Sequence, residues 1–406
     1  MTFPNLYMQF SSIRERYAVI ILNIILFVLQ FDTFTFVREG GMGFLSPFRI
    51  IVLPLCVYYF ISWNNRLNKS DLHKFILTAL FFIFCILGDL LSQISNLGSM
   101  IGNIVMLYFS FFWFKKNTIR RSTLYIITTW CAIQIPVFIS LLLSGGIGIG
   151  ERFKGLHFDP NYLCAYVIPA IWASIYLLKD EKRKYLRLYN LSIIFSGILI
   201  VLLSFSRGGL LALLATGFVY FFSYYRKIAI ILIIGVCLGA SYMLSIAPYV
   251  DYSDASTSFF LGFVYRNFSS VDDINELTSG RSDLIAAFIE EISKGNYIVF
   301  GASLPQYMHD VNDGFNSHNG FVDLCAQGGL IIGGVFSLLL LLSCIQIFIL
   351  AIRYNKISYE YLLALSLLLP LLFLSFEAKI SWLVFGLIIS MSNKSIYKRM
   401  ISIPKI

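Results

Sequence analysis

The chain has 406 residues, of which 58% are hydrophobic and only 13% are charged, and its formal net charge is +9. Soluble domains carry roughly 25% charged residues, so this composition and the mean hydropathy of +0.78 exclude an ordinary soluble protein. They predict an all-α protein that crosses a membrane many times. The seven cysteines show no CxxC or zinc spacing, so we interpret them as packing residues.

The apolar runs predict about twelve membrane-spanning helices. The first run follows Arg14 and Arg16 and is too long for the core of a signal peptide, so we interpret it as a span. The spans divide the chain into residues 1–246 with nine helices, a hydrophilic segment 247–328, and residues 329–406 with three helices and a tail. They lie near 17–36, 45–63, 74–93, 98–114, 123–143, 161–178, 189–204, 208–225, 228–246, 329–352, 359–376 and 380–392.

The distribution of basic residues predicts how these spans are oriented. Of the 31 Lys and Arg residues, 22 fall in the two terminal segments and in the loops that follow even-numbered spans. Because basic loops stay in the cytoplasm, both termini are expected there. The positive charge is thus explained by topology, and no nucleic-acid partner is needed.

The hydrophilic segment 247–328 then falls on the outer face. Its middle, GRSDLIAAFIEEIS at 280–293, has apolar residues near helical spacing, with Ser282 as a plausible N-cap. A structureless loop of this length would be unusual in a compact protein. We therefore expect a structured loop with an amphipathic helix.

The first motif on the outer face is GIGIGERFKGLHFDPNYLCAY at 146–166. Its glycine-rich start is no phosphate loop, since no strand precedes it and no GK[ST] follows. Asp159 before Pro160 is typical of a helix start, so Asp159 and Asn161 are either capping residues or ligands. The basic residues are either solvated charges or ligands. The candidate binding residues here are Arg152, Lys154, His157, Asp159 and Asn161.

The second motif is SFSRGG at 204–209, within an otherwise apolar run. An arginine costs about 3 kcal/mol at the centre of a spanning helix, but here it falls between two spans on the outer side. Gly208 and Gly209 either make a tight turn or let a ligand approach closely. Arg207 either marks the interface or is a fixed cation aimed at an anionic group.

The third motif comprises Arg281 and SHNGFVDLCAQGGLIIGG at 317–334. His318 is a candidate general base that Asn319 or Asp323 would orient, the alternative being an ordinary loop histidine. Neither the histidines nor the outer carboxylates have the spacing of a metal site, so we expect no metal and no cofactor.

In their order and spacing, GLHFDPNYLCAYVIPA, SFSRGGLLALL, SGRSDLI and the segment 317–334 resemble the O-antigen ligase and polymerase superfamily of bacterial inner-membrane proteins. The resemblance covers about residues 145–345. It implies a GT-C-like helical fold and a metal-independent glycosyltransferase whose donor is a glycan on undecaprenyl diphosphate. It also implies that the functional arginines map to Arg207 and Arg281 and the periplasmic-loop histidine to His318, with Arg152 and Lys154 as further basic residues.

The segment 317–334 looks more like the polymerase and capsule-type members than the enteric ligases. We therefore expect an O-antigen polymerase that joins lipid-linked repeat units on the periplasmic side of the inner membrane. Its expected partners are that glycan, the bilayer and a membrane protein that regulates chain length. The alternatives are a ligase that transfers the glycan to lipid A-core, and a transporter of a lipid-linked glycan. A transporter predicts internal repeats, which the chain lacks, and a scaffold would not explain the spacing of the motifs.

Overall fold

The structure is a computed structural model that describes residues 3–35, 46–62, 69–91, 97–144, 152–250, 261, 264, 281–302, 319–372 and 378–402. Within these ranges the regular secondary structure is entirely helical, and the only bridge outside helices joins Phe34 and His157. Eight of the described helices are long and apolar enough to cross a membrane. The prediction of an all-α protein embedded in a membrane is confirmed to that extent.

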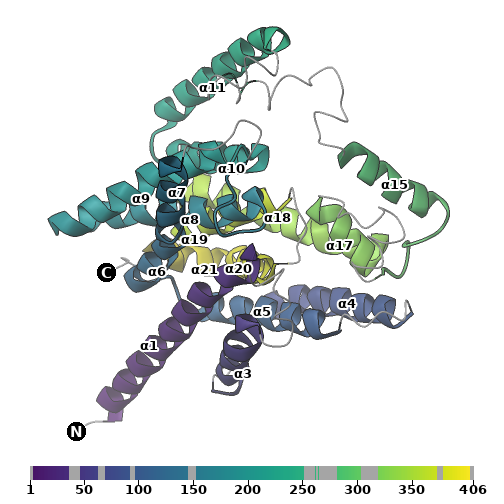
Figure 1. The fold of residues 1–406 in the computed structure, drawn as a ribbon. Coiled ribbons are helices and arrows are strands. Elements are labelled where there is room, and N and C mark those ends of the chain that lie inside the picture. The colour runs from purple at the N-terminus through teal and green to yellow at the C-terminus, as the bar shows by residue number, and fades with distance from the viewer. Residues whose placement is uncertain are drawn as a thin grey trace.

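The helices of the first half are α1 (Phe3–Leu29), η1 (Gln30–Thr33), η3 (Phe48–Val52), α3 (Leu53–Ser62), α4 (Lys69–Leu91), α5 (Leu97–Lys116), α6 (Arg121–Ala132) and α7 (Gln134–Leu143). The second half contains α8 (Pro160–Asp180), α9 (Lys184–Leu203), α10 (Arg207–Tyr224), α11 (Arg226–Ile246), η4 (Ala247–Tyr249), α15 (Arg281–Ser293), α17 (Gly320–Gly328), α18 (Leu330–Tyr354), α19 (Tyr359–Leu372), α20 (Lys379–Met391) and α21 (Lys394–Ser402) (Figure 1). A helix lies in each predicted apolar run, although α1 begins well before residue 17 and only eight of the described helices are long and apolar enough to span a membrane.

The run 123–143 lies within one candidate span, Arg121–Leu143, as predicted, but the helix is interrupted at Ile133, where α6 and α7 meet. Pro136 explains the break, since proline has no backbone N–H and its ring crowds the carbonyl four residues earlier. The break matters for the outer loop, because Gln134 at the start of α7 is fully buried and accepts a hydrogen bond from Leu156 N.

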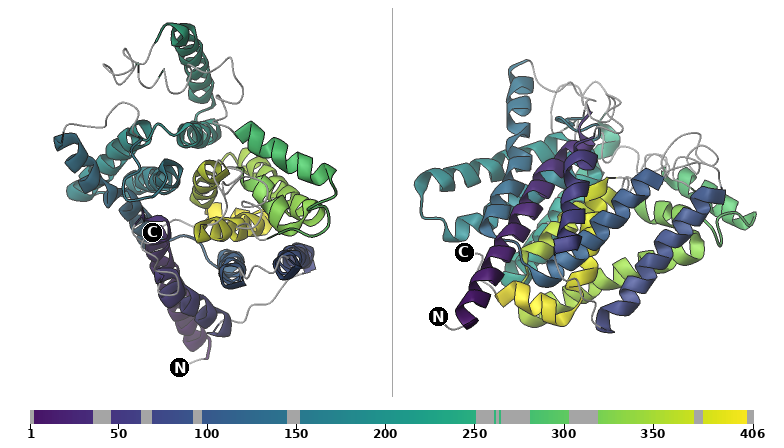
Figure 2. Two further views of the ribbon diagram at one scale, coloured as in Figure 1. Left: turned by 45° about the vertical axis from the view of Figure 1, so that its right-hand side comes forward. Right: turned by 90° about the horizontal axis from the view of Figure 1, so that it is seen from below.

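The centre of the molecule is formed by α8, α19 and α20, and all the residues of α20 are buried. Helix α5 packs closely on α20, where a Cβ on Gly386 would lie 2.2 Å from the Leu107 carbonyl oxygen. By contrast, only 6% of the apolar window of α11 is buried, against 83% for α8. Helix α11 stands apart from the bundle beside α10, as Figures 1 and 2 show. Its exposed isoleucines and leucines suit contact with lipid.

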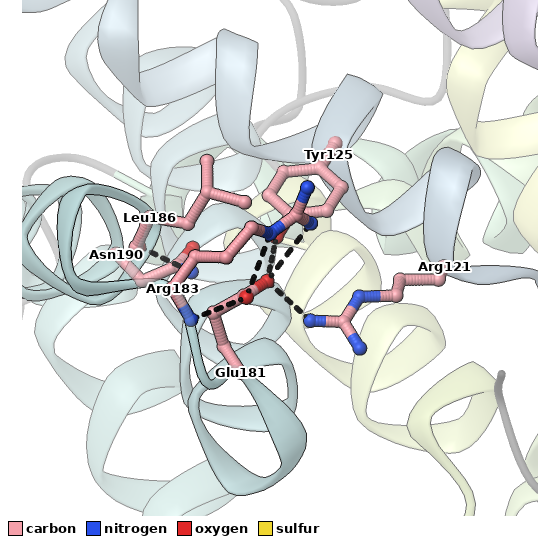
Figure 3. Close-up of polar contacts among 6 residues, drawn as sticks. All are labelled: Arg121, Tyr125, Glu181, Arg183, Leu186 and Asn190. Carbon is pink, nitrogen blue, oxygen red and sulfur yellow. Dashed lines mark hydrogen bonds and ion pairs between the residues drawn. The ribbon is translucent and has the colours of Figure 1, made fainter.

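One end of the bundle collects basic loops, and we call it the basic end. There Arg226 donates to Asn355 Oδ1 at 2.7 Å, and Arg399 donates to the Lys115 carbonyl at 2.7 Å. The Glu181 carboxylate, in the loop between α8 and α9, binds Arg121, Arg183 and Tyr125 (Figure 3). The opposite end of the bundle carries the starts of α8 and α10. Both helices are mostly apolar between the two ends.

Part of the hydrophilic segment is described at that opposite end. Helix α15 covers the predicted amphipathic stretch, and its Phe288 packs against Ala326 of α17. Ala302 N donates to the Ala326 carbonyl at 2.9 Å, which ties the turn residues after α15 to α17. The Ser282 side chain, predicted as a cap, lies outside the described residues.

Candidate functional site

Helix α8 begins as the sequence predicts. Asp159 has extended backbone angles, its side chain accepts a hydrogen bond from Asn161 N at 2.7 Å, and Pro160 occupies the first helical position. Proline is suited to that position because its missing N–H would have no helical partner there. Asp159 is therefore a capping residue, whatever else it contacts.

Helix α10 begins beside it and is linked to it by a side-chain hydrogen bond. Ser206 is the N-cap of α10 and accepts from Gly209 N at 2.9 Å. The Ser206 hydroxyl in turn donates to Asn161 Oδ1, and both residues are buried. Asn161 thus joins the two helix starts, a role that the sequence alone did not indicate.

The two glycines of SFSRGG are already helical, and the turn lies before them at Phe205, whose φ is +47°. Gly209 instead allows a close helix contact, because a Cβ there would lie 2.3 Å from Cys164 Sγ. Cys164 Sγ also lies 3.2 Å from the Ser204 hydroxyl. Gly209 therefore serves the packing of α10 on α8 rather than the turn, and both Gly208 and Gly209 are buried.

Two arginines meet at this junction. Arg207 is the first residue of α10 and is half-buried, while Arg152 Nε donates to the Ser204 carbonyl at 3.3 Å. The Arg152 guanidinium is thus anchored three residues before Arg207, so two like charges lie at one junction. Each helix start adds a partial positive charge of about half an elementary charge. We call Arg152, Arg207 and the starts of α8 and α10 the arginine site, whose charge favours a phosphate or another anion.

Two cavities adjoin the arginine site. The first, of about 560 Å³, opens to the surface against α7 and is lined by Arg152 and the exposed Lys154. The second is a groove of about 770 Å³ between α8, α9, α10 and α11, with an almost wholly apolar lining. It begins at Leu211, one helical turn after Arg207, and Trp172 and Ile198 also line it. The open cavity thus adjoins Arg152, and the apolar groove begins one turn beyond Arg207.

His157 is fully buried and lies against η1 rather than in either cavity. The Gln134 amide oxygen accepts from Leu156 N, so its NH₂ faces His157 Nε2 at 3.4 Å. Nε2 is then an acceptor, and Nδ1–H donates to the Thr33 hydroxyl at 2.8 Å. Burial lowers the pKa of His157 to about 3, so the ring is neutral. It stacks on Tyr166 and fixes the loop before α8.

The remaining predicted residues are only partly described. Arg281 begins α15, but its side chain lies outside the described residues, as does the whole of His318. Asn319 caps α17 by accepting from Phe321 N at 3.1 Å and Val322 N at 3.3 Å. Asp323 is fully buried within α17. The structure therefore brings together Arg152, Arg207, Asp159, Asn161 and the glycines, whereas the placement of Arg281 and His318 beside them stays a prediction.

Sequence reasoning missed the residues that hold the site together. These are Gln134 and Thr33 around His157, and Cys164, Ser204 and Ser206 at the junction. The serines flanking Phe205 were visible in SFSRGG, but their partners come from a segment about 40 residues earlier. In the part of the chain that the structure describes, no three His, Cys, Asp or Glu side chains gather as metal ligands.

No protein-family model matches the chain, and no curated protein matches it.

Proposed function

We propose that the chain is an O-antigen polymerase in the inner membrane of a bacterium. In this proposal it has about twelve spans in a GT-C-like arrangement, its termini are cytoplasmic, and the arginine site faces the periplasm. The positive-inside pattern supports this orientation, because the basic end lies opposite the arginine site.

The observation that carries the proposal is the pair of arginines at one junction, with an open cavity lined by Arg152 and an apolar groove that begins one helical turn after Arg207. A lipid-linked glycan has the same three parts in the same order: a sugar chain, a diphosphate and an isoprenoid. With the diphosphate at Arg152 and Arg207, the isoprenoid would enter the groove at Leu211 and the sugars would occupy the cavity beside Lys154.

The proposed reaction joins two lipid-linked units. The acceptor hydroxyl oxygen attacks the anomeric carbon of the growing glycan, and the bond from that carbon to the diphosphate oxygen breaks. His318 takes the hydroxyl proton, and Arg207, Arg281 and Arg152 stabilise the leaving diphosphate. The roles of His318 and Arg281 are supported by the sequence resemblance alone.

The test is the lipopolysaccharide profile of a deletion strain that carries plasmid-borne variants. We expect a core with a single repeat unit in the deletion strain and a full ladder with the wild type. Arg207→Lys should not restore the ladder, because a point charge does not replace a two-pronged guanidinium. Arg187→Lys, an exposed residue at the basic end, is the matched control and should restore it.

Other profiles would reject specific parts of the proposal. A bare core with accumulating lipid-linked polymer identifies a ligase instead, and repeat units confined to the cytoplasmic leaflet identify a transporter. A normal ladder with His318→Ala rejects that residue as the base. Inhibition of the purified protein by EDTA, reversed by a divalent ion, rejects catalysis by arginines without metal.

A further inference from the structure

A separate pocket lies at the basic end, about 30 Å from the arginine site along the 21 residues of α8. Its volume is about 200 Å³, and we call it the basic pocket. Parts of α6, α8, α10, α19 and α21 meet around it, so residues far apart in the sequence, from Arg121 to Ile401, contribute. Its polar and charged lining comprises Arg121, Tyr176, Lys179, Asp180, Tyr224, Lys356, Ser358 and Tyr359.

Lys179 is held in place by aromatic rings. Its ammonium lies 4.7 Å from the Tyr176 ring, 5.2 Å from Tyr220 and 4.7 Å from Tyr224. Cation–π contacts of this kind orient the side chain but leave its positive charge uncompensated. Within the described ranges no carboxylate lies within 4 Å of the ammonium.

Arg121 supplies a second donor with unused capacity. One terminal nitrogen of its guanidinium binds Glu181, as Figure 3 shows. Its Nε atom is buried and has no hydrogen-bond partner among the described residues. The residue lines the pocket, so its positive charge adds to that of Lys179.

The rest of the lining does not oppose an anion. The Ile357 carbonyl already accepts from the Tyr176 hydroxyl at 3.0 Å and the Tyr224 hydroxyl at 3.2 Å. The lining contains one carboxylate, that of Asp180. It contains three cations, Arg121, Lys179 and Lys356. The pocket therefore keeps a net positive charge.

The volume and the apolar part of the lining restrict the ligand. The volume of about 200 Å³ is several times the roughly 30 Å³ share of one water, which is enough for a phosphate with a few carbons. Leu124, Leu177, Met400 and Ile401 line the remainder. We propose that the basic pocket binds a phosphate group, supplied by the headgroup of an anionic lipid such as phosphatidylglycerol. This inference does not depend on the proposed polymerase function.

The test uses the full-length protein and two charge-matched variants. Lys179→Gln removes the caged ammonium, whereas Lys182→Gln removes an exposed charge three residues away that does not line the pocket. Binding of phosphatidylglycerol is measured by native mass spectrometry in nanodiscs that otherwise contain phosphatidylcholine. A second arm adds inorganic phosphate to lipid-depleted protein in detergent and follows the thermal midpoint.

We expect Lys179→Gln to weaken phosphatidylglycerol binding about tenfold, as the loss of one charged hydrogen bond predicts, and Lys182→Gln to leave it unchanged. If inorganic phosphate alone raises the thermal midpoint of the wild type but not that of Lys179→Gln, the basic pocket still binds a phosphate group, but the group comes from free phosphate rather than from a lipid. Equal effects of the two variants, or no response to either ligand, would overturn the proposal.

Discussion

Gly209→Ala tests whether the junction of α8 and α10 is as tight as the structure indicates. The added Cβ would lie 2.3 Å from Cys164 Sγ and 2.7 Å from Cys164 Cβ, both well inside ordinary contact at about 3.4–4 Å. Overpacking of this kind costs about 1–3 kcal/mol, and exchanging a helical glycine for alanine recovers about 1 kcal/mol. With the steric cost near its upper end, we expect a net loss of about 2 kcal/mol in the free energy of unfolding.

The chain offers a matched control on the same helix. A Cβ on Gly217 would meet nothing within 4 Å, so Gly217→Ala should stabilise by about 1 kcal/mol through helix propensity alone. A second control removes the obstacle: in a Cys164→Gly background the nearest atom to the new Cβ is the Ser206 hydroxyl oxygen at 3.1 Å. There Gly209→Ala should be neutral or stabilising.

Denaturant unfolding of the purified protein in detergent, followed by tryptophan fluorescence, measures all four variants. The reasoning is refuted if Gly209→Ala and Gly217→Ala change the unfolding free energy alike, or if Cys164→Gly does not relieve the cost of Gly209→Ala.

Three further predictions concern buried polar groups. Below pH 6.5 the unfolded chain protonates His157, whereas the folded chain, in which the pKa of His157 is about 3, does not. The free energy of unfolding should therefore fall by about 1.4 kcal/mol for each pH unit below 6.5. The same measurement on His157→Gln should show a weaker dependence on pH. Arg183 and Arg121 hold the pKa of Glu181 below its usual range. The ionised carboxylate therefore stabilises the fold above about pH 4.3, and this stabilisation is lost as the pH falls. Glu181→Gln should therefore lower the thermal midpoint more at pH 7 than at pH 4. Lys379→Met should cost about 1–3 kcal/mol in denaturant unfolding, because Asn103 Oδ1 and Ser99 Oγ each lose a donor within 3 Å.

Sequence patterns predicted the helices well because a membrane imposes a length and a composition on each span separately. The start of α8 was equally predictable, since Asp159 and Pro160 act on their own helix. The break at Ile133 was missed because a run of apolar residues continues across it, although Pro136 was visible.

Contacts between distant segments were beyond the sequence patterns. A histidine beside basic residues in an outer loop suggested a ligand, yet His157 is buried against Thr33, more than 100 residues away. In the same way, two consecutive glycines suggested a turn. Gly209 is needed because Cys164 of another helix lies against it, and nothing near residue 209 in the sequence indicates that neighbour.

These long-range contacts bear directly on the arginine site. Bringing Arg152 and Arg207 together places two like charges beside two positive helix ends, which by itself favours separation. The Ser206–Asn161 hydrogen bond and the close contact of Gly209 with Cys164 hold the helix starts together against that repulsion. A bound diphosphate would remove the repulsion, so it should stabilise the junction as well as bind to it. Gly209→Ala should then weaken the binding of an anion at the arginine site, even though Gly209 itself need not contact the anion.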